Sequence, residues 1–79
     1  MWLQNKGYLI KTFEFNNLAS AADFAEAIAE PRILTFIKAS LAEKKHFVTV
    51  KIKSRHHADT LSKKEKKILD GIEEKYFHM

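Results

Sequence analysis

In the stretch from Phe47 to Ser54, aliphatic residues alternate with Thr49, Lys51 and Lys53, and this alternation constrains the fold more than any other pattern. Its aliphatic positions are Val48, Val50 and Ile52. A strand with this period buries one face and leaves the other in water, which is typical of an antiparallel sheet. The chain therefore needs neighbouring strands for hydrogen bonding and apolar elements that cover the aliphatic face.

A helix is predicted from Leu18 to Ala29, because apolar residues recur there with helical spacing. These residues are Leu18, Ala21, Ala22, Ala25, Ile28 and Ala29. Asn17 precedes the segment and can accept a hydrogen bond from a free N–H of the first turn. Pro31 lacks an N–H donor and disfavours a helical conformation at Glu30, so the predicted helix ends there.

An N-terminal hairpin is predicted from Trp2–Gln4 and Tyr8–Phe15, which flank a turn-like Asn5-Lys6-Gly7. One face of the second strand carries two phenylalanines, and we expect that face to be buried. The residues of this face are Leu9, Lys11, Phe13 and Phe15. Lys11 is out of phase with the others, so its aliphatic stem must lie along apolar surface while its ammonium reaches an edge.

The segment Arg32–Ser40 fits two structures. It forms a second helix if Pro31 is the first helical residue, with an apolar stripe at Ile33, Leu34, Phe36, Ile37 and Leu41. It forms a strand if one face carries Ile33, Thr35, Ile37 and Ala39. Periodicity alone leaves both alternatives open.

The last predicted element is a helix that follows a polar connection at Arg55–Thr60. Ser62 is its expected N-cap, and Glu65 stands three residues later, which is the spacing of a capping box. Its expected buried stripe consists of Leu61, Ile68, Leu69, Ile72 and Tyr76.

These elements predict an α+β fold, in which two helices pack on one face of a four-stranded antiparallel sheet if 32–40 is a strand. The 79 residues form a single domain, 1–79, because a chain of this length has only enough apolar surface for one core. We expect that core to contain Leu18, Phe24, Ile28, Val48, Val50, Ile52, Ile68 and Ile72.

Composition excludes several classes of protein. The chain has no cysteine, so it forms no disulfide and has no thiolate metal site or cysteine nucleophile. No apolar run approaches the ~20 residues that span a bilayer, and the N-terminus lacks the pattern of a signal peptide. We therefore expect a soluble, cytoplasmic protein without membrane contacts.

Four segments together resemble the pterin-4a-carbinolamine dehydratase family, whose members are also dimerisation cofactors of a homeodomain transcription factor. The segments are Leu9-Ile10-Lys11-x-Phe13-x-Phe15, Leu18-x-x-Ala21-x-x-Phe24-x-x-x-Ile28-Ala29, Val48-x-Val50-x-Ile52-x-Ser54 and Leu61-Ser62-x-x-Glu65. Each segment is a degenerate apolar pattern, and the resemblance depends on their order and spacing. It covers most of the chain, and the family pattern fits residues 18–55 without a gap.

The resemblance implies a four-stranded antiparallel sheet with helices on one face, assembly into homodimers or homotetramers, and dehydration of a 4a-hydroxytetrahydropterin without a cofactor. The helix that precedes the tryptophan in the family has no counterpart before Trp2, so we expect a version of the fold without that helix. The small size of the chain also favours self-association, which would add buried surface.

When the family pattern is placed on residues 18–55 without a gap, the catalytic positions of the family hold other residues in this chain. A His-His-Pro motif of the family falls on Ile37, Lys38 and Ala39, and a third histidine falls on Arg55. Dehydration of a carbinolamine needs groups that donate and accept protons near neutral pH, a role suited to imidazole. Ile37 and Ala39 have no exchangeable side-chain proton, and arginine is a poor general acid. We expect the dehydration chemistry to be lost.

Other histidines offer an alternative. His56 and His57 follow Arg55 directly, so a one-residue shift would put His56 in the position of the third histidine, while His46 begins the alternating strand. The simpler interpretation is that His56 and His57 are solvated loop residues. A zinc site of His46, His56 and His57 is geometrically possible, but no carboxylate stands at motif spacing, so we predict no metal or cofactor.

The whole chain has a net charge of +4, and its basic residues cluster in the second half. A possible basic binding face consists of Lys51, Lys53, Lys63, Lys64 and Lys67. Such a face can attract nucleic acid or an acidic protein, but lysines on solvent faces are ordinary and no aromatic stacking motif accompanies these.

Three hypotheses about function follow. The first is a dehydratase-like domain that has lost catalysis and acts as an oligomeric binding or interaction module for a protein partner or a pterin. The second is a divergent active dehydratase that uses loop histidines. The third is a nucleic-acid-binding domain.

Overall fold

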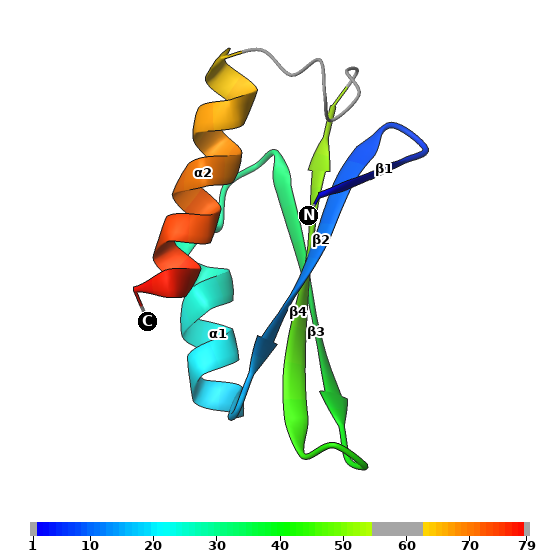
Figure 1. The fold of residues 1–79 in the computed structure, drawn as a ribbon, viewed down its shortest axis with the longest axis vertical. Coiled ribbons are helices and arrows are strands. Elements are labelled where there is room, and N and C mark those ends of the chain that lie inside the picture. Colours follow the sequence, from blue (N-terminus) through cyan, green and yellow to red (C-terminus); the bar gives the residue numbers. More distant parts are fainter. Residues whose placement is uncertain (1, 55–62, 79) are drawn as a thin grey trace.

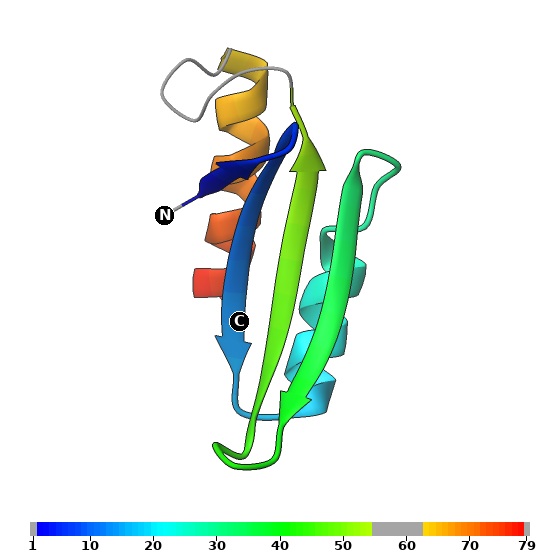
Figure 2. The ribbon, with the colours of Figure 1, turned by 90° about the vertical axis from the view of Figure 1, so that its right-hand side faces the viewer.

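The computed structural model describes residues 2–54 and 63–78. Its strands form one antiparallel sheet in the order β1-β2-β4-β3, and both helices lie on the same face of that sheet (Figures 1 and 2). The elements are β1 (Leu3–Asn5), β2 (Tyr8–Phe15), α1 (Leu18–Ala27), β3 (Ile33–Ser40), β4 (Lys45–Lys53) and α2 (Lys63–Phe77). The predicted α+β fold with two helices on one face of a four-stranded antiparallel sheet is confirmed.

The first hairpin has a tighter turn than predicted. Asn5 belongs to β1 and pairs with Tyr8, so the turn consists of Lys6 and Gly7 alone. Their φ angles are 50° and 83°, and a two-residue hairpin turn of the type that follows strand twist requires positive φ at both positions. Gly7 adopts this conformation without steric cost, which explains the glycine there.

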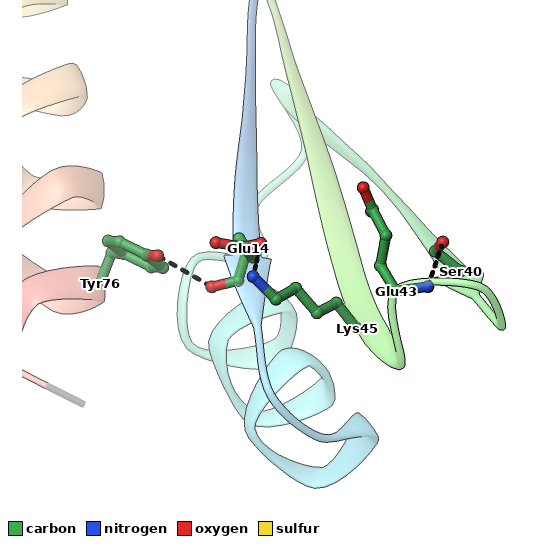
Figure 3. A network of polar contacts seen from close by, with 5 residues as sticks. All are labelled: Glu14, Ser40, Glu43, Lys45 and Tyr76. Atoms are coloured by element: carbon green, nitrogen blue, oxygen red, sulfur yellow. Dashed lines mark hydrogen bonds and ion pairs between the residues drawn. The ribbon is translucent and has the colours of Figure 1, made fainter.

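The segment 33–40 is a strand, so the helical alternative for it is wrong. β3 pairs with β4 along its whole length, from Ile33 opposite Ile52 to Ser40 opposite Lys45. A turn at residues 41–44 joins the two strands, and in it the Glu43 N–H donates to the Ser40 hydroxyl over 3.4 Å (Figure 3). Long-range pairing with β4 therefore decides the structure of this apolar segment, whose periodicity fits both a helix and a strand.

Helix α1 begins at the predicted residue. The Asn17 side chain accepts a hydrogen bond from the Ser20 N–H over 2.8 Å, which confirms the predicted N-cap. The helix ends at Ala27, two residues before the predicted end, and Ile28 caps it by donating its N–H to the Phe24 carbonyl over 3.1 Å.

The buried face of α1 is narrower than predicted. It consists of Ala21, Phe24 and Ile28, with Ala25 half-buried. Leu18 is 54% exposed, so its predicted place in the core is wrong. Leu18 is the first residue of α1, which follows the end of β2 after two residues. Ala22 and Ala29 are also exposed.

The core lies between the inner face of the sheet and the two helices. The predicted alternation in β4 is confirmed, since Val48, Val50 and Ile52 are all buried. Phe24 is the largest fully buried side chain, and its ring centre lies 4.9 Å from that of Phe13 and 5.8 Å from that of Tyr76. The other buried apolar residues are Leu9, Phe13, Phe15, Ile33, Leu69 and Ile72, while Ile68 and Tyr76 are partly buried against them.

Polar contacts attach α2 to the sheet. The ammonium of Lys11 forms an ion pair with the carboxylate of Glu73 on α2, which explains how a lysine is accommodated on the inner face of β2. The Tyr76 hydroxyl donates to the Glu14 carbonyl over 2.8 Å, and the Glu14 carboxylate contacts Lys45 at 2.7 Å (Figure 3). Leu61 and Ser62, the predicted first stripe residue and N-cap, lie outside the described residues.

No helix within residues 2–54 and 63–78 is both long and apolar enough to cross a membrane.

Candidate functional site

A cavity of about 630 Å³ opens at the end of the sheet where β2 begins and β4 ends. Strand pairing places Tyr8 opposite Lys53 at this end, the turn before β3 contributes Pro31 and Arg32, and the first turn of α2 contributes Glu65. The described lining residues are Tyr8, Pro31, Arg32, Leu34, Lys53, Ser54 and Glu65.

A buried polar pair borders this cavity. Ser54 is 4% exposed, and its N–H donates to the Gly7 carbonyl over 2.9 Å, so the residue after β4 is fixed to the first hairpin. Its hydroxyl donates to the carboxylate of Glu65. This hydrogen bond joins the end of β4 to the start of α2, and it gives the half-buried carboxylate a donor within the protein.

The accessible part of the cavity wall combines positive charge with apolar surface. Arg32 and Lys53 are both exposed, and neither forms an ion pair with any residue in the described part of the chain. Tyr8 is half-buried, and Leu34 is 46% exposed. This arrangement can hold a flat apolar group against the tyrosine and an anionic group against the cations.

Three of the four positions that the family resemblance makes catalytic lie in β3, and the fourth, Arg55, lies outside the described residues. Ile37, Lys38 and Ala39 lie in β3 opposite Val48, Phe47 and His46, respectively. Ser54, the residue before Arg55, lies six residues beyond Val48, which corresponds to about 20 Å along a strand. The triplet is therefore distant from the end of β4 that leads to Arg55, which is itself outside the described residues.

The structure describes one of the three candidate histidines, His46. His56 and His57 lie outside the described residues. His46 pairs with Phe15 and Ala39 at the end of the sheet opposite the cavity, and its Nδ1 is buried without a hydrogen-bond partner among the described residues. No cluster of three histidine, aspartate or glutamate side chains suited to a metal occurs within residues 2–54 and 63–78.

The predicted basic face is divided between two layers. Lys51 and Lys53 alternate with the buried residues of β4, so they lie on the sheet face opposite the helices, where the Lys51 ammonium is 5.5 Å from the centre of the Phe36 ring. The remaining members, Lys63, Lys64 and Lys67, belong to α2 in the helical layer (Figure 1).

The outer face of the sheet is the second candidate surface. No described element covers it in the view of Figure 2. Its apolar side chains come from all four strands and include Leu3, Ile10, Leu34, Phe36 and Phe47. Phe36 is 53% exposed and lies on β3, which has β4 on one side and no described strand on the other.

The sequence interpretation missed the cavity residues Tyr8, Arg32 and Leu34. A usable signal was present in Pro31-Arg32, since a proline turn before a strand brings the next side chain to the end of a sheet. That signal required 33–40 to be recognised as a strand.

No family model, curated protein or solved structure matches this chain.

Proposed function

We propose that this protein is a non-catalytic relative of the pterin-4a-carbinolamine dehydratases that acts as an oligomeric binding module. The observation that carries the proposal is the open outer edge of β3, an eight-residue strand with exposed apolar side chains. Exposed edges present unpaired N–H and C=O groups, and natural proteins usually shorten, charge or cover them. β3 has neither proline nor bulge to block pairing, and Lys38 is its only charged residue.

The proposed assembly is an antiparallel pairing of β3 with β3 of a second copy. A two-fold axis at Phe36 places Phe36 opposite its own copy and Leu34 opposite Lys38 of the other copy. Paired residues in a ladder point to the same face, so this register extends the sheet and keeps all helices on one side. An aromatic pair at the axis stabilises the ladder, and the register keeps the two Lys38 side chains apart.

The described lining of the cavity supports a binding role. Its exposed cations, Arg32 and Lys53, can hold an anionic group. Ser54 and Glu65 are joined to each other. Binding rather than proton transfer is what this arrangement favours.

Light scattering on the purified protein tests the assembly. At about 100 µM we expect a mass of at least twice 9.2 kDa, because specific interfaces of ordinary size persist at this concentration. Phe36→Lys should give a monomer, since it places two ammonium groups opposite each other at the axis.

The matched control is Phe77→Lys, the same substitution at a side chain that is 76% exposed near the end of α2. It should leave the mass unchanged. Thr12→Lys adds a charge to the outer face of the sheet on β2, which is not an edge strand. It should therefore disrupt an assembly through the sheet faces but leave one through the β3 edges intact. A monomeric wild type, or a Phe36→Lys protein that stays dimeric, contradicts the proposed assembly.

A further inference from the structure

We infer that the cavity at the end of β4 binds a small aromatic acid, meaning one flat ring that carries a carboxylate. This inference goes beyond the proposed assembly, because it concerns the end of the sheet rather than the β3 edge. The volume of the cavity, about 630 Å³, falls within the ~300–1,000 Å³ of typical small-molecule sites. A single-ring ligand fits this volume together with a few water molecules.

The charges of the cavity favour an anion. Arg32 and Lys53 contribute two positive charges, and Glu65 contributes the single negative charge of the described lining. The Glu65 carboxylate already accepts the Ser54 hydroxyl, whereas the two cations have no ionic partner among the described residues. A guanidinium offers two parallel donors to a carboxylate, so Arg32 is the expected anchor of the acid group.

The apolar part of the lining favours a flat ring. Tyr8 is half-buried and Leu34 is exposed, and both line the cavity together with the rigid ring of Pro31. A tyrosine ring can stack on a second aromatic ring in offset or edge-on geometry. A small aliphatic acid makes the charge contact without the ring contact, so it should bind more weakly.

Two further cavities differ from this one in their described lining. A cavity of about 280 Å³ between the end of α1 and α2 contains Lys67 and Lys75, but it has no aromatic side chain, Glu30 adds a negative charge, and the Lys75 ammonium donates to the Ala27 carbonyl over 2.7 Å. A third cavity, of about 320 Å³, lies beside Glu14 and Tyr76 and has no basic residue in its described lining. Of these three cavities, the one that contains Arg32 is the one whose described lining joins cations to an aromatic side chain.

Anthranilate is a suitable probe, because it is a fluorescent aromatic carboxylate. Titration into the full chain should give saturable binding at one site per chain, together with changes in the amide NMR resonances of Arg32 and Ser54. Arg32→Gln should weaken binding at least ~10-fold, since it removes a charged hydrogen-bond donor. Lys53→Gln and Tyr8→Leu should each weaken it several-fold.

The control variant is Lys75→Gln, which removes one positive charge from an exposed side chain in the last turn of α2, away from both the cavity lining and the β3 edge. It should bind anthranilate as the wild type does. Anthranilamide, which has the same ring without the charge, should bind at least ~10-fold more weakly, and so should acetate, which has the charge without the ring.

Three outcomes overturn the inference: no saturable binding up to ~10 mM, equal binding of anthranilate and anthranilamide, or an unchanged affinity in Arg32→Gln. The Phe36→Lys variant distinguishes this inference from the proposed assembly. It should bind anthranilate as tightly as the wild type, because the described cavity lining does not include Phe36.

Discussion

Truncation of Phe24 to alanine tests the core that both helices share with the sheet. The side chain is fully buried, and its ring centre lies within 4.9 to 5.8 Å of those of Phe13, Phe15 and Tyr76. A buried Phe→Ala change typically costs about 3–5 kcal/mol, and the loss of three ring contacts places this one in the upper half of that range.

The cost is large relative to the stability of the protein. A domain of 79 residues has a free energy of unfolding of about 4–12 kcal/mol, so Phe24→Ala should remove between about a third and all of it. If the variant stays folded, the midpoint of thermal unfolding should fall by at least ~12 °C, at about 4–8 °C per kcal/mol.

Urea unfolding followed by circular dichroism measures this change, with all proteins at one concentration because self-association alters the midpoint. The control is Phe77→Ala, which truncates a phenylalanine that is 76% exposed and should change the free energy by less than ~1 kcal/mol. A loss below ~1.5 kcal/mol for Phe24→Ala would refute the placement of this ring at the centre of the core.

Two further predictions concern the sheet. Val50→Asp should destabilise the domain strongly, and Val48→Asp still more. A carboxylate at position 50 would have Lys11 as its neighbour on β2, whereas one at position 48 would lie between Phe13 and Ile37. Equal losses of unfolding free energy in chemical denaturation would contradict this. Glu14, through its hydrogen bond and then its charge, raises the pKa of Lys45 above 10.5, so the folded state holds this proton more tightly. Its contribution to stability is complete below pH ~10.5 and disappears as the pH rises through the folded-state pKa. Lys45→Gln should therefore be less stable than the wild type at pH ~8, and this difference should shrink as the pH rises above ~10.5; a difference in urea midpoints that stays constant with pH opposes this reasoning.

Local patterns in the sequence were sufficient where a structure depends on neighbouring residues. The alternation from Val48 to Ile52 predicted the buried face of β4, and Asn17 predicted the start of α1, because strand period and helix capping are local properties. The segment 33–40 was ambiguous because its apolar residues fit both periods, and its pairing with β4 decided between them.

Long-range contacts account for what the sequence did not predict. Leu18 has the spacing of a buried residue, but it is the first residue of α1 and is 54% exposed. The partner of Lys11 is Glu73, which is 62 residues further along the chain. Arg32 and Lys53 meet at one cavity only because β3 and β4 pair in the observed register. Periodicity contains no information about that register.

A dehydration assay with a 4a-hydroxytetrahydropterin and the purified protein tests the central claim, that this chain binds rather than catalyses. Positioned acid–base groups typically contribute ~10²–10⁴-fold, and without them the protein should not accelerate dehydration above the uncatalysed rate at neutral pH. Turnover that titrates near pH ~6–7 and is lost in His56→Ala or His57→Ala would contradict the claim and establish the loop histidines as catalysts. Turnover that survives alanine at His46, His56 and His57 together would contradict both the claim and that alternative.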